Sequence, residues 1–170
     1  LNLVNRNFPR ARVWITEYAY QTNPPDRFGV SPELQARYIG ESARRVYEAN
    51  KVDMLIHDLY RDEPSLARWQ SGLVTVRERP KLGLAAMRLP LTQVRRQGSQ
   101  TTVWGQVRPG DGPQRYSLQR KLRGTWVTLG GPRMTNRRGF LQRTVSAPRG
   151  SQIRLWYFEQ RVASPPLTVR

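Results

Sequence analysis

The pattern that most restricts the fold lies in the first third of the chain, where two short apolar runs flank a helix. Val13-Trp14-Ile15 and the run from Val52 to Tyr60 have the length and β-branched content of buried strands. Between them, residues 31–50 carry the signals of a helix. A strand, a helix and a second strand within about fifty residues form a βαβ unit. The sequence therefore predicts two parallel neighbouring strands joined by a right-handed crossover.

The predicted helix has a clear start. Ser31 is a suitable N-cap, Pro32 follows at the first helical position, and Glu33 places an acid in the first turn. Apolar residues then recur at helical spacing, so one face is expected to pack and the other to contact water. A second helix is predicted over residues 80–87, and Leu89-Pro90 ends it.

Short alternating runs replace this pattern from Thr92 onward. Clusters of glycine and proline separate them, as in Pro109-Gly-Asp-Gly-Pro113. Evenly spaced short strands predict an antiparallel β-sandwich of roughly 80 residues, slightly under the immunoglobulin-like size. The predicted strands are residues 102–107, 116–122, 125–129, 140–145 and 153–158. We therefore expect an α/β part over residues 1–91 and an all-β part over residues 92–170.

The composition argues against several kinds of site. The chain has no cysteine and a single histidine, His57, so disulfides and cysteine ligands are excluded, and neither a histidine-based metal site nor a Ser-His-Asp triad is expected. No apolar run reaches the roughly 18 residues of a membrane span, and nothing resembles a signal peptide. The chain begins with Leu1, in a segment that resembles the tail of an earlier helix, so we expect a fragment or a processed product.

The charge is strongly positive and unevenly spread. The chain has 29 Lys and Arg against 12 Asp and Glu, a net charge of +17, and only Lys51, Lys81 and Lys121 are lysines. Residues 92–170 hold 15 of the cations, against Asp111 and Glu159 as the acids. Such a field attracts polyanions weakly and in a salt-dependent way, but solubility is the simpler explanation.

A carboxylate follows the first apolar run in an aromatic setting. Glu17 ends this stretch and is followed by Tyr18 and Tyr20. A charge beside a buried strand costs free energy unless it is paired or takes part in chemistry. The structural alternative is an ion pair with Arg12 or Arg27, and the functional alternative is a catalytic carboxylate.

Several motifs together resemble the end of a (β/α)8 TIM barrel. They are Arg12-Val-Trp-Ile-Thr-Glu17, the following Tyr18-Ala-Tyr-Gln-Thr22, then Trp69-Gln-Ser-Gly-Leu73 and Pro80-Lys-Leu-Gly-Leu-Ala-Ala-Met-Arg-Leu-Pro90. In this order and spacing they are similar to the clan A retaining glycoside hydrolases, the cellulase-like and xylosidase-like enzymes. The resemblance covers residues 1–91 as strand 7, helix 7, strand 8 and helix 8. Residues 92–170 resemble, more weakly, the small immunoglobulin-like or fibronectin-like β-sandwich that often follows such barrels.

The resemblance implies that Glu17 is the nucleophile, because the seventh strand of that clan ends in a glutamate with this role. Barrel active sites lie at the carboxyl ends of the strands, and Glu17 lies at that end of its predicted strand. Retaining hydrolysis also needs a second carboxyl about 5–5.5 Å away. The clan carries that group on strand 4, which this chain lacks. We therefore expect no turnover by this chain alone.

Further expectations follow from the same resemblance. The substrate is a poly- or oligosaccharide cleaved with retention, no cofactor is needed, and the missing barrel strands of the same protein are the partner. The location is extracellular or in the cell envelope. The predicted substrate-binding residues are Tyr18, Tyr20, Tyr60 and Trp69, since aromatic faces suit the apolar faces of pyranose rings.

Each of these side chains also has a plain structural interpretation. The tyrosines can pack with their hydroxyls in water, and Trp69 can anchor the core beneath the last helix. His57 suits a buried imidazole with satisfied hydrogen bonds better than a catalytic one. Asp62 and Glu63 suit either the catalytic rim or a turn and helix cap.

A second hypothesis is a stand-alone basic β-sandwich module that binds acidic glycans or nucleic acid. The aromatic residues of that part alternate with arginines, a pattern that suits either bound bases or a core with solvated flanks. They are Trp104, Trp126, Trp156, Tyr157 and Phe158. Because no RNA-binding consensus, helix-turn-helix or zinc-finger spacing is visible, nucleic acid is expected to bind only weakly and non-specifically.

Overall fold

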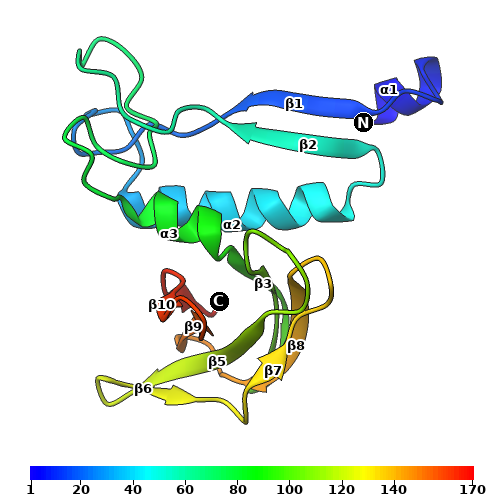
Figure 1. Ribbon diagram of the computed structural model, residues 1–170, viewed down its shortest axis with the longest axis vertical. Coiled ribbons are helices and arrows are strands. Elements are labelled where there is room, and N and C mark those ends of the chain that lie inside the picture. The colour runs from blue at the N-terminus through cyan, green and yellow to red at the C-terminus, as the bar shows by residue number, and fades with distance from the viewer.

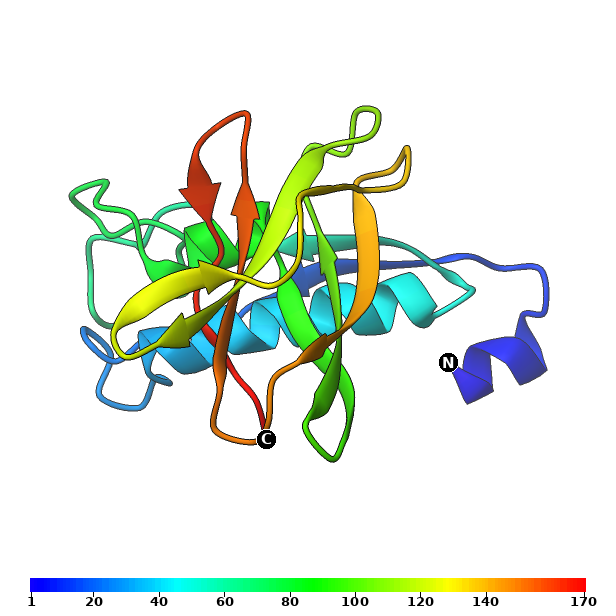
Figure 2. The same ribbon diagram turned by 90° about the horizontal axis from the view of Figure 1, so that it is seen from below.

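The computed structural model describes residues 1–170 and has two parts, an α/β layer and a larger β part (Figure 1). The fold is mixed and mostly β, with one small parallel sheet and two antiparallel sheets. The strands of the β part curl into a half-barrel, which lies below the long helix in Figure 1 and in front of it in Figure 2. None of the helices is long and apolar enough to cross a membrane.

The predicted βαβ unit is present. It consists of β1 (Val13–Tyr18), α2 (Pro32–Glu48) and β2 (Val52–His57). The two strands are parallel, with Val13 opposite Val52 and Tyr18 opposite His57. Strand β2 ends three residues earlier than the predicted Tyr60, so the residues that follow His57 belong to the loop at the carboxyl edge of the sheet.

Local signals in the sequence explain where α2 begins and which way it faces. The Ser31 hydroxyl accepts a hydrogen bond from the Leu34 amide at 3.2 Å, which is an N-cap contact. Ile39 and its buried neighbours turn inward. Gly40 lies against the start of the β part, because a Cβ there would stand 2.9 Å from the Leu91 carbonyl oxygen. This glycine allows the helix to contact the second part closely.

Two short helices accompany α2. α1 (Asn2–Asn7) has no buried residue and lies apart from the rest of the chain (Figure 2). α3 (Leu82–Arg88) confirms the helix predicted over residues 80–87 and packs on α2. Their shared apolar cluster has four buried members, Ala36, Ile39, Leu73 and Ala86.

The β part contains all five predicted strands and four more. The three-stranded sheet is β3 (Leu91–Gln97), β4 (Gln100–Gln106) and β8 (Phe140–Ser146). The six-stranded sheet is β5 (Arg115–Leu122), β6 (Thr125–Thr128), β7 (Arg133–Met134), β9 (Gln152–Tyr157), β10 (Val162–Ala163) and β11 (Leu167–Thr168). The sequence did not predict β3, whose later residues are charged and exposed. It forms because a tight turn at Gly98, with φ +56°, folds it back on β4.

The two antiparallel sheets enclose the main core of the molecule. It has 13 buried residues, among which Val103, Leu118, Ile153 and Leu155 are 0% exposed. Trp104 is also buried, and its ring lies 5.5 Å from that of Tyr47 on α2, which ties the helix to this part. Trp104 is therefore a core residue, as the structural interpretation predicted.

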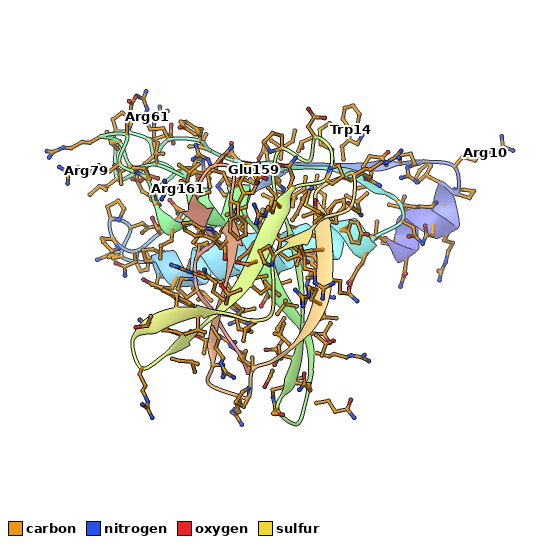
Figure 3. The ribbon with its side chains drawn as sticks, turned by 60° about the horizontal axis from the view of Figure 1, so that its bottom comes forward. Arg10, Trp14, Arg61, Arg79, Glu159 and Arg161 are labelled. Atoms are coloured by element: carbon orange, nitrogen blue, oxygen red, sulfur yellow. The ribbon has the colours of Figure 1, made fainter.

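One face of the parallel sheet has no covering layer. Leu55 and His57 face α2, because they line a small cavity together with Ile39 and other helix residues. On the opposite face Trp14 is 62% exposed and Met54 is 38% exposed. The Trp14 side chain projects away from the helix and the β part (Figure 3). A parallel sheet is normally buried on both faces, so this apolar face is unusual.

Candidate active site at the carboxyl ends of β1 and β2

A pocket of about 210 Å³ opens where the two parallel strands end. Two of its lining residues lie on β1, two lie in the loop after β1, and three follow β2. The lining residues are Glu17, Tyr18, Ala19, Gln21, Asp58, Trp69 and Ser71. The structure thus brings together Glu17, Tyr18 and Trp69, which the sequence places up to about fifty residues apart.

Glu17 is exposed and has no side-chain partner. No hydrogen bond or ion pair reaches its carboxylate, so the predicted alternative of an ion pair with Arg12 or Arg27 is wrong. The Arg12 guanidinium binds Asp53 on β2 instead, with Nε 3.0 Å from Oδ1. Arg27 lies over the Phe28 ring at 4.5 Å. A free carboxylate at the end of a parallel strand is available for chemistry.

Tyr18 links the strand to the helix. Its hydroxyl donates a hydrogen bond to the Tyr38 carbonyl oxygen on α2 at 3.0 Å. Burial raises the pKa of Tyr18, so the hydroxyl remains a protonated donor. The ring meets Tyr20 edge to face at 5.8 Å. The polar end of Tyr18 is therefore engaged in the scaffold, and only the ring is available to the pocket.

Trp69 is not a core residue, because its side chain is 60% exposed. It lines the Glu17 pocket and also a neighbouring hollow of about 570 Å³. Phe28 and Leu66 line this second hollow and are 81% and 66% exposed. Gln21 is shared by both hollows. Exposed apolar side chains therefore continue outward from the carboxylate.

Tyr20 and Tyr60 lie outside both hollows. Tyr20 is 42% exposed and stacks on Tyr38 at 4.6 Å. Tyr60 is 66% exposed, and its carbonyl oxygen accepts the amides of Leu73 and Val74, each at 2.9 Å. The structure does not bring these two tyrosines into contact with the Glu17 pocket.

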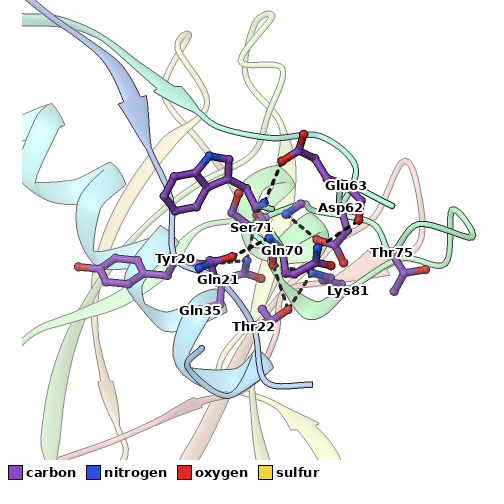
Figure 4. A network of polar contacts seen from close by, with 12 residues as sticks. Tyr20, Gln21, Thr22, Gln35, Asp62, Glu63, Gln70, Ser71, Thr75 and Lys81 are labelled. Carbon is purple, nitrogen blue, oxygen red and sulfur yellow. Dashed lines mark hydrogen bonds and ion pairs between the residues drawn. The ribbon is translucent and has the colours of Figure 1, made fainter. Parts of the chain in front are cut away.

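A buried ion pair holds the loops around the pocket (Figure 4). Lys81 Nζ lies 2.6 Å from Asp62 Oδ1, and the side chains are 7% and 1% exposed. Lys81 also donates to Thr22 Oγ1 at 2.7 Å, while Asp62 accepts the Gly72 amide at 2.8 Å. Neither the rim nor the helix-cap interpretation of Asp62 anticipated this pair. It joins the loop after β1 to the loop after β2.

Glu63 fixes the backbone of the loop that carries the indole. Its Oε2 accepts the Trp69 amide at 2.8 Å, and its Oε1 lies 3.2 Å from Arg68. The hydrogen bond from the Trp69 backbone N–H, and after it the contact with Arg68, lower the pKa of Glu63 below its ordinary value. Glu63 therefore has a turn role, as the structural interpretation of this residue predicted.

Buried amide side chains complete the scaffold. Gln35 on α2 donates to the carbonyl oxygens of Tyr20 at 3.0 Å and Ser71 at 3.2 Å (Figure 4). His57 Nε2 also lies 3.0 Å from the Ser71 carbonyl oxygen, whereas its Nδ1 is buried without a partner. Burial lowers the pKa of His57, so the neutral ring is favoured. His57 is a scaffold residue with one ring nitrogen satisfied.

Three polar residues of the pocket were missed in the sequence. Asp58, Gln21 and Ser71 were not predicted as site residues. A signal for Asp58 existed, because it directly follows a β-capable run, as Glu17 does. It was missed because the predicted strand extended to Tyr60, which placed Asp58 inside the strand. No group of three or more His, Cys, Asp or Glu side chains is arranged to hold a metal ion.

Comparisons with known proteins find similarity in structure only. No family model matches this chain, and no curated protein matches it. Among solved structures, it is similar to a calcium-binding mutant of β-glucuronidase 2 from Bacteroides uniformis, with 16% identity and a TM-score of 0.44 over 99% of this chain and 22% of that one. It is also similar to a β-glucuronidase from glycoside hydrolase family 2, with 14% identity and a TM-score of 0.32 over 94% of this chain and 19% of that one. The chain thus spans about a fifth of the length of these enzymes, and the likeness assigns no role to any of its residues.

Proposed function

We propose that residues 1–91 form the last quarter of a (β/α)8 barrel of a retaining glycoside hydrolase, with Glu17 as its nucleophile. The observation that carries this proposal is the environment of Glu17. The carboxylate lies at the carboxyl end of a parallel strand, it is exposed and unpaired, and it shares a pocket with the exposed Trp69 ring. These are the features expected of a barrel nucleophile beside an aromatic sugar platform.

The two unpaired edges of the parallel sheet support the proposal of a barrel. Strands β1 and β2 form a sheet of only two strands, so each has an unpaired edge. The face turned away from α2 carries exposed apolar side chains, including Trp14, Met54 and Ile56. In a barrel, further parallel strands pair with both edges and this face turns to the packed interior. Residues 92–170 are then the accessory immunoglobulin-like or fibronectin-like β-sandwich, and α2 joins the two domains.

The proposed chemistry needs a second carboxyl group. In retaining hydrolysis one carboxylate attacks the anomeric carbon, and a carboxylic acid about 5–5.5 Å away protonates the leaving oxygen. The other carboxylate of the pocket is Asp58, which follows β2. We assign the acid to barrel strands outside this chain, as the clan A resemblance implies. Asp58 then acts as a neighbour of the nucleophile, and the isolated chain is inactive.

The substrate is a carbohydrate in this proposal, handled outside the cell or in its envelope. The Trp69 ring supports a sugar next to Glu17, and the Tyr18 ring borders it. Neither Tyr20 nor Tyr60 lines the pocket of the isolated chain. In this proposal they contribute to the rim of a longer cleft in the complete barrel.

Glu17→Gln in the longer protein that contains this chain tests the assignment. The change removes the charge and keeps the shape, so we expect loss of aryl-glycoside turnover. Because Glu17 is exposed and unpaired, the unfolding free energy should change by no more than about 0.5 kcal/mol. Glu33→Gln, an exposed acid on α2, is the matched control and should keep full activity. Retained activity in the Glu17 variant would refute the nucleophile.

The 170-residue chain itself tests the need for further strands. We expect no hydrolysis of an aryl glycoside by the purified chain, because the acid is absent. Turnover that Glu17→Gln abolishes would contradict this part of the proposal while supporting the nucleophile. An activated 2-deoxy-2-fluoroglycoside, which traps a glycosidase nucleophile as an ester, should label the longer protein at Glu17 and leave the Glu17→Gln variant unlabelled.

A further inference from the structure

The outer face of the six-stranded sheet carries a row of cations stacked on aromatic rings. Its inner face holds Leu118, Ile153 and Leu155 in the core. Side chains alternate along strands, so the residues between these face outward. We call this surface the cation–aromatic face, formed by Arg115, Lys121, Trp126, Arg154, Trp156 and Phe158.

Cations and rings alternate across the three strands. The Arg154 guanidinium on β9 lies 4.4 Å from the Trp126 ring centre on β6 and 5.7 Å from that of Trp156. Lys121 on β5 lies directly opposite Trp126 in the sheet and 6.0 Å from its ring. Arg115, at the other end of β5, lies 4.7 Å from the Phe158 ring. These are cation–π distances, which hold each charge at the surface in a defined place.

These cations have no acidic partners. Every ion pair in the molecule lies between residues 12 and 81. Arg154 Nε donates to the neutral Gln119 Oε1 at 2.7 Å, which orients the guanidinium without neutralising it. Partial burial lowers the pKa of Arg154, in keeping with a charge that lacks a carboxylate. A row of oriented and uncompensated cations is complementary to an anionic ligand.

The geometry favours one class of anion. Single-stranded nucleic acid binds by stacking its bases on free aromatic faces. Here the Arg154 guanidinium already lies over the rings of Trp126 and Trp156, so the face offers oriented charges more than empty stacking positions. Guanidinium groups bind carboxylates in a two-point fork. Sugar rings with a carboxylate on each unit suit such a row, since apolar ring edges remain beside the charges.

We propose that the cation–aromatic face of residues 92–170 binds an acidic polysaccharide, with Arg154 as its central contact and Arg115 and Lys121 on either side. This inference does not depend on the assignment of Glu17. It gives the β part a ligand of its own, and the binding weakens as salt is raised because the contacts are ionic.

Polygalacturonate, a carboxylated polysaccharide, is the probe, and dextran is its neutral counterpart. Binding to the 170-residue chain is measured by titration of tryptophan fluorescence and by affinity electrophoresis. Arg154→Gln should weaken polygalacturonate binding about tenfold, the effect of losing a charge-assisted contact. Arg149→Gln removes the same charge from an exposed turn and is the matched control, with a loss of less than about threefold. Dextran should bind to neither variant nor to the parent chain.

Several outcomes would overturn the proposal. Equal losses in the two arginine variants would mean that only net charge attracts the polymer. Tighter binding of single-stranded oligothymidylate than of polygalacturonate, with loss in Arg154→Gln, would assign the face to nucleic acid. Absence of polygalacturonate binding at low salt would show that this face is not a binding site. If Arg154→Gln lowers the melting temperature, the exposed Lys121→Gln is the substitute and must still reduce binding more than Arg149→Gln does.

Discussion

The two parts of this molecule are held together by different kinds of interaction. The β part supplies twelve of the 13 buried residues of the main core, the other being Leu89 after α3, and its cations have no acidic partners. The α/β part has only four buried residues in its apolar cluster, yet all six ion pairs of the protein lie in it. Burial of apolar area stabilises the first. The second relies on a buried ion pair and amide side chains, which fix geometry more than they add stability.

This difference matches the positions of the two candidate sites. Apart from Glu17 and Tyr18 at the end of β1, the Glu17 pocket is built from loops, which are held by Lys81, Asp62 and Gln35. The cation–aromatic face lies on regular strands above a dense core. A site on loops depends on its polar supports, whereas a face on a sheet depends on the strands alone. The predictions below test this contrast.

Lys81→Met should have the largest effect. It leaves the Asp62 carboxylate, 1% exposed, buried without its cation. Loss of one partner of a buried pair costs about 3–5 kcal/mol. We expect this cost to appear as faster hydrogen exchange of the Gly72, Leu73 and Val74 amides, while amides of β9 keep their protection.

The matched control is the exposed pair between Arg12 and Asp53. Their side chains are 54% and 39% exposed, so Arg12→Met should leave the free energy of unfolding almost unchanged. Combining Lys81→Met with Asp62→Asn should restore part of the lost stability. The neutral Asn side chain buries no charge, and its oxygen can still accept the hydrogen bond from the Gly72 backbone N–H. Similar costs for the buried and exposed pairs would remove the contrast between the two parts.

Leu155→Ala and Ile39→Ala compare the two apolar clusters directly. Leu155 is 0% exposed within the large core, and Ile39 is 3% exposed within the small one. Large-to-small core changes cost about 2–5 kcal/mol, and the cost is greater where the surroundings cannot collapse. We expect Leu155→Ala near the upper end and Ile39→Ala near the lower end, measured by urea unfolding. Equal costs would remove the contrast between the two clusters. A reversed order would show that the small cluster is the stiffer one.

The smallest effect is a pH dependence confined to the α/β part, where His57 is the single histidine of the chain. Burial lowers the pKa of folded His57 below its ordinary value of 6.5, so the unfolded chain binds more protons near pH 6. Stability is then fully present above pH 6.5 and falls as the pH drops toward the folded pKa. The unfolding free energy between pH 7 and 5 should show this slope. His57→Gln should remove it, and a slope that persists in this variant would assign it to other groups.

The local structure was largely predictable from the sequence. The cap at Ser31, the period of α2 and the alternation of five β strands are properties of neighbouring residues, and each prediction is confirmed within a few residues. The parallel pairing of β1 and β2 followed from their order around a helix. Strand β3 was not predicted, because its pairing depends on a turn at Gly98 and on β4, rather than on its own alternation.

The candidate site was predicted only in part. Glu17, Tyr18 and Trp69 meet in one pocket, but Tyr20 and Tyr60 do not reach it. Asp58 was missed because the end of a strand is set by where its pairing stops, and that point depends on the neighbouring strand. The structural alternative for Glu17, an ion pair with Arg12 or Arg27, is wrong, since Arg12 binds Asp53 across the sheet and Arg27 lies over the Phe28 ring.

The sequence alone determined the order and type of the main helices and strands, because caps, turns and hydrophobic periods act over a few residues. The tertiary structure decided the exposure of each tryptophan. Trp104 is buried, Trp69 is exposed, and Trp126 lies under Arg154. It also decided that Lys81 meets Thr22, 59 residues away, and Asp62 in one buried cluster. Burial and long-range pairing depend on which distant segments the fold brings together, and no short stretch of sequence contains that information.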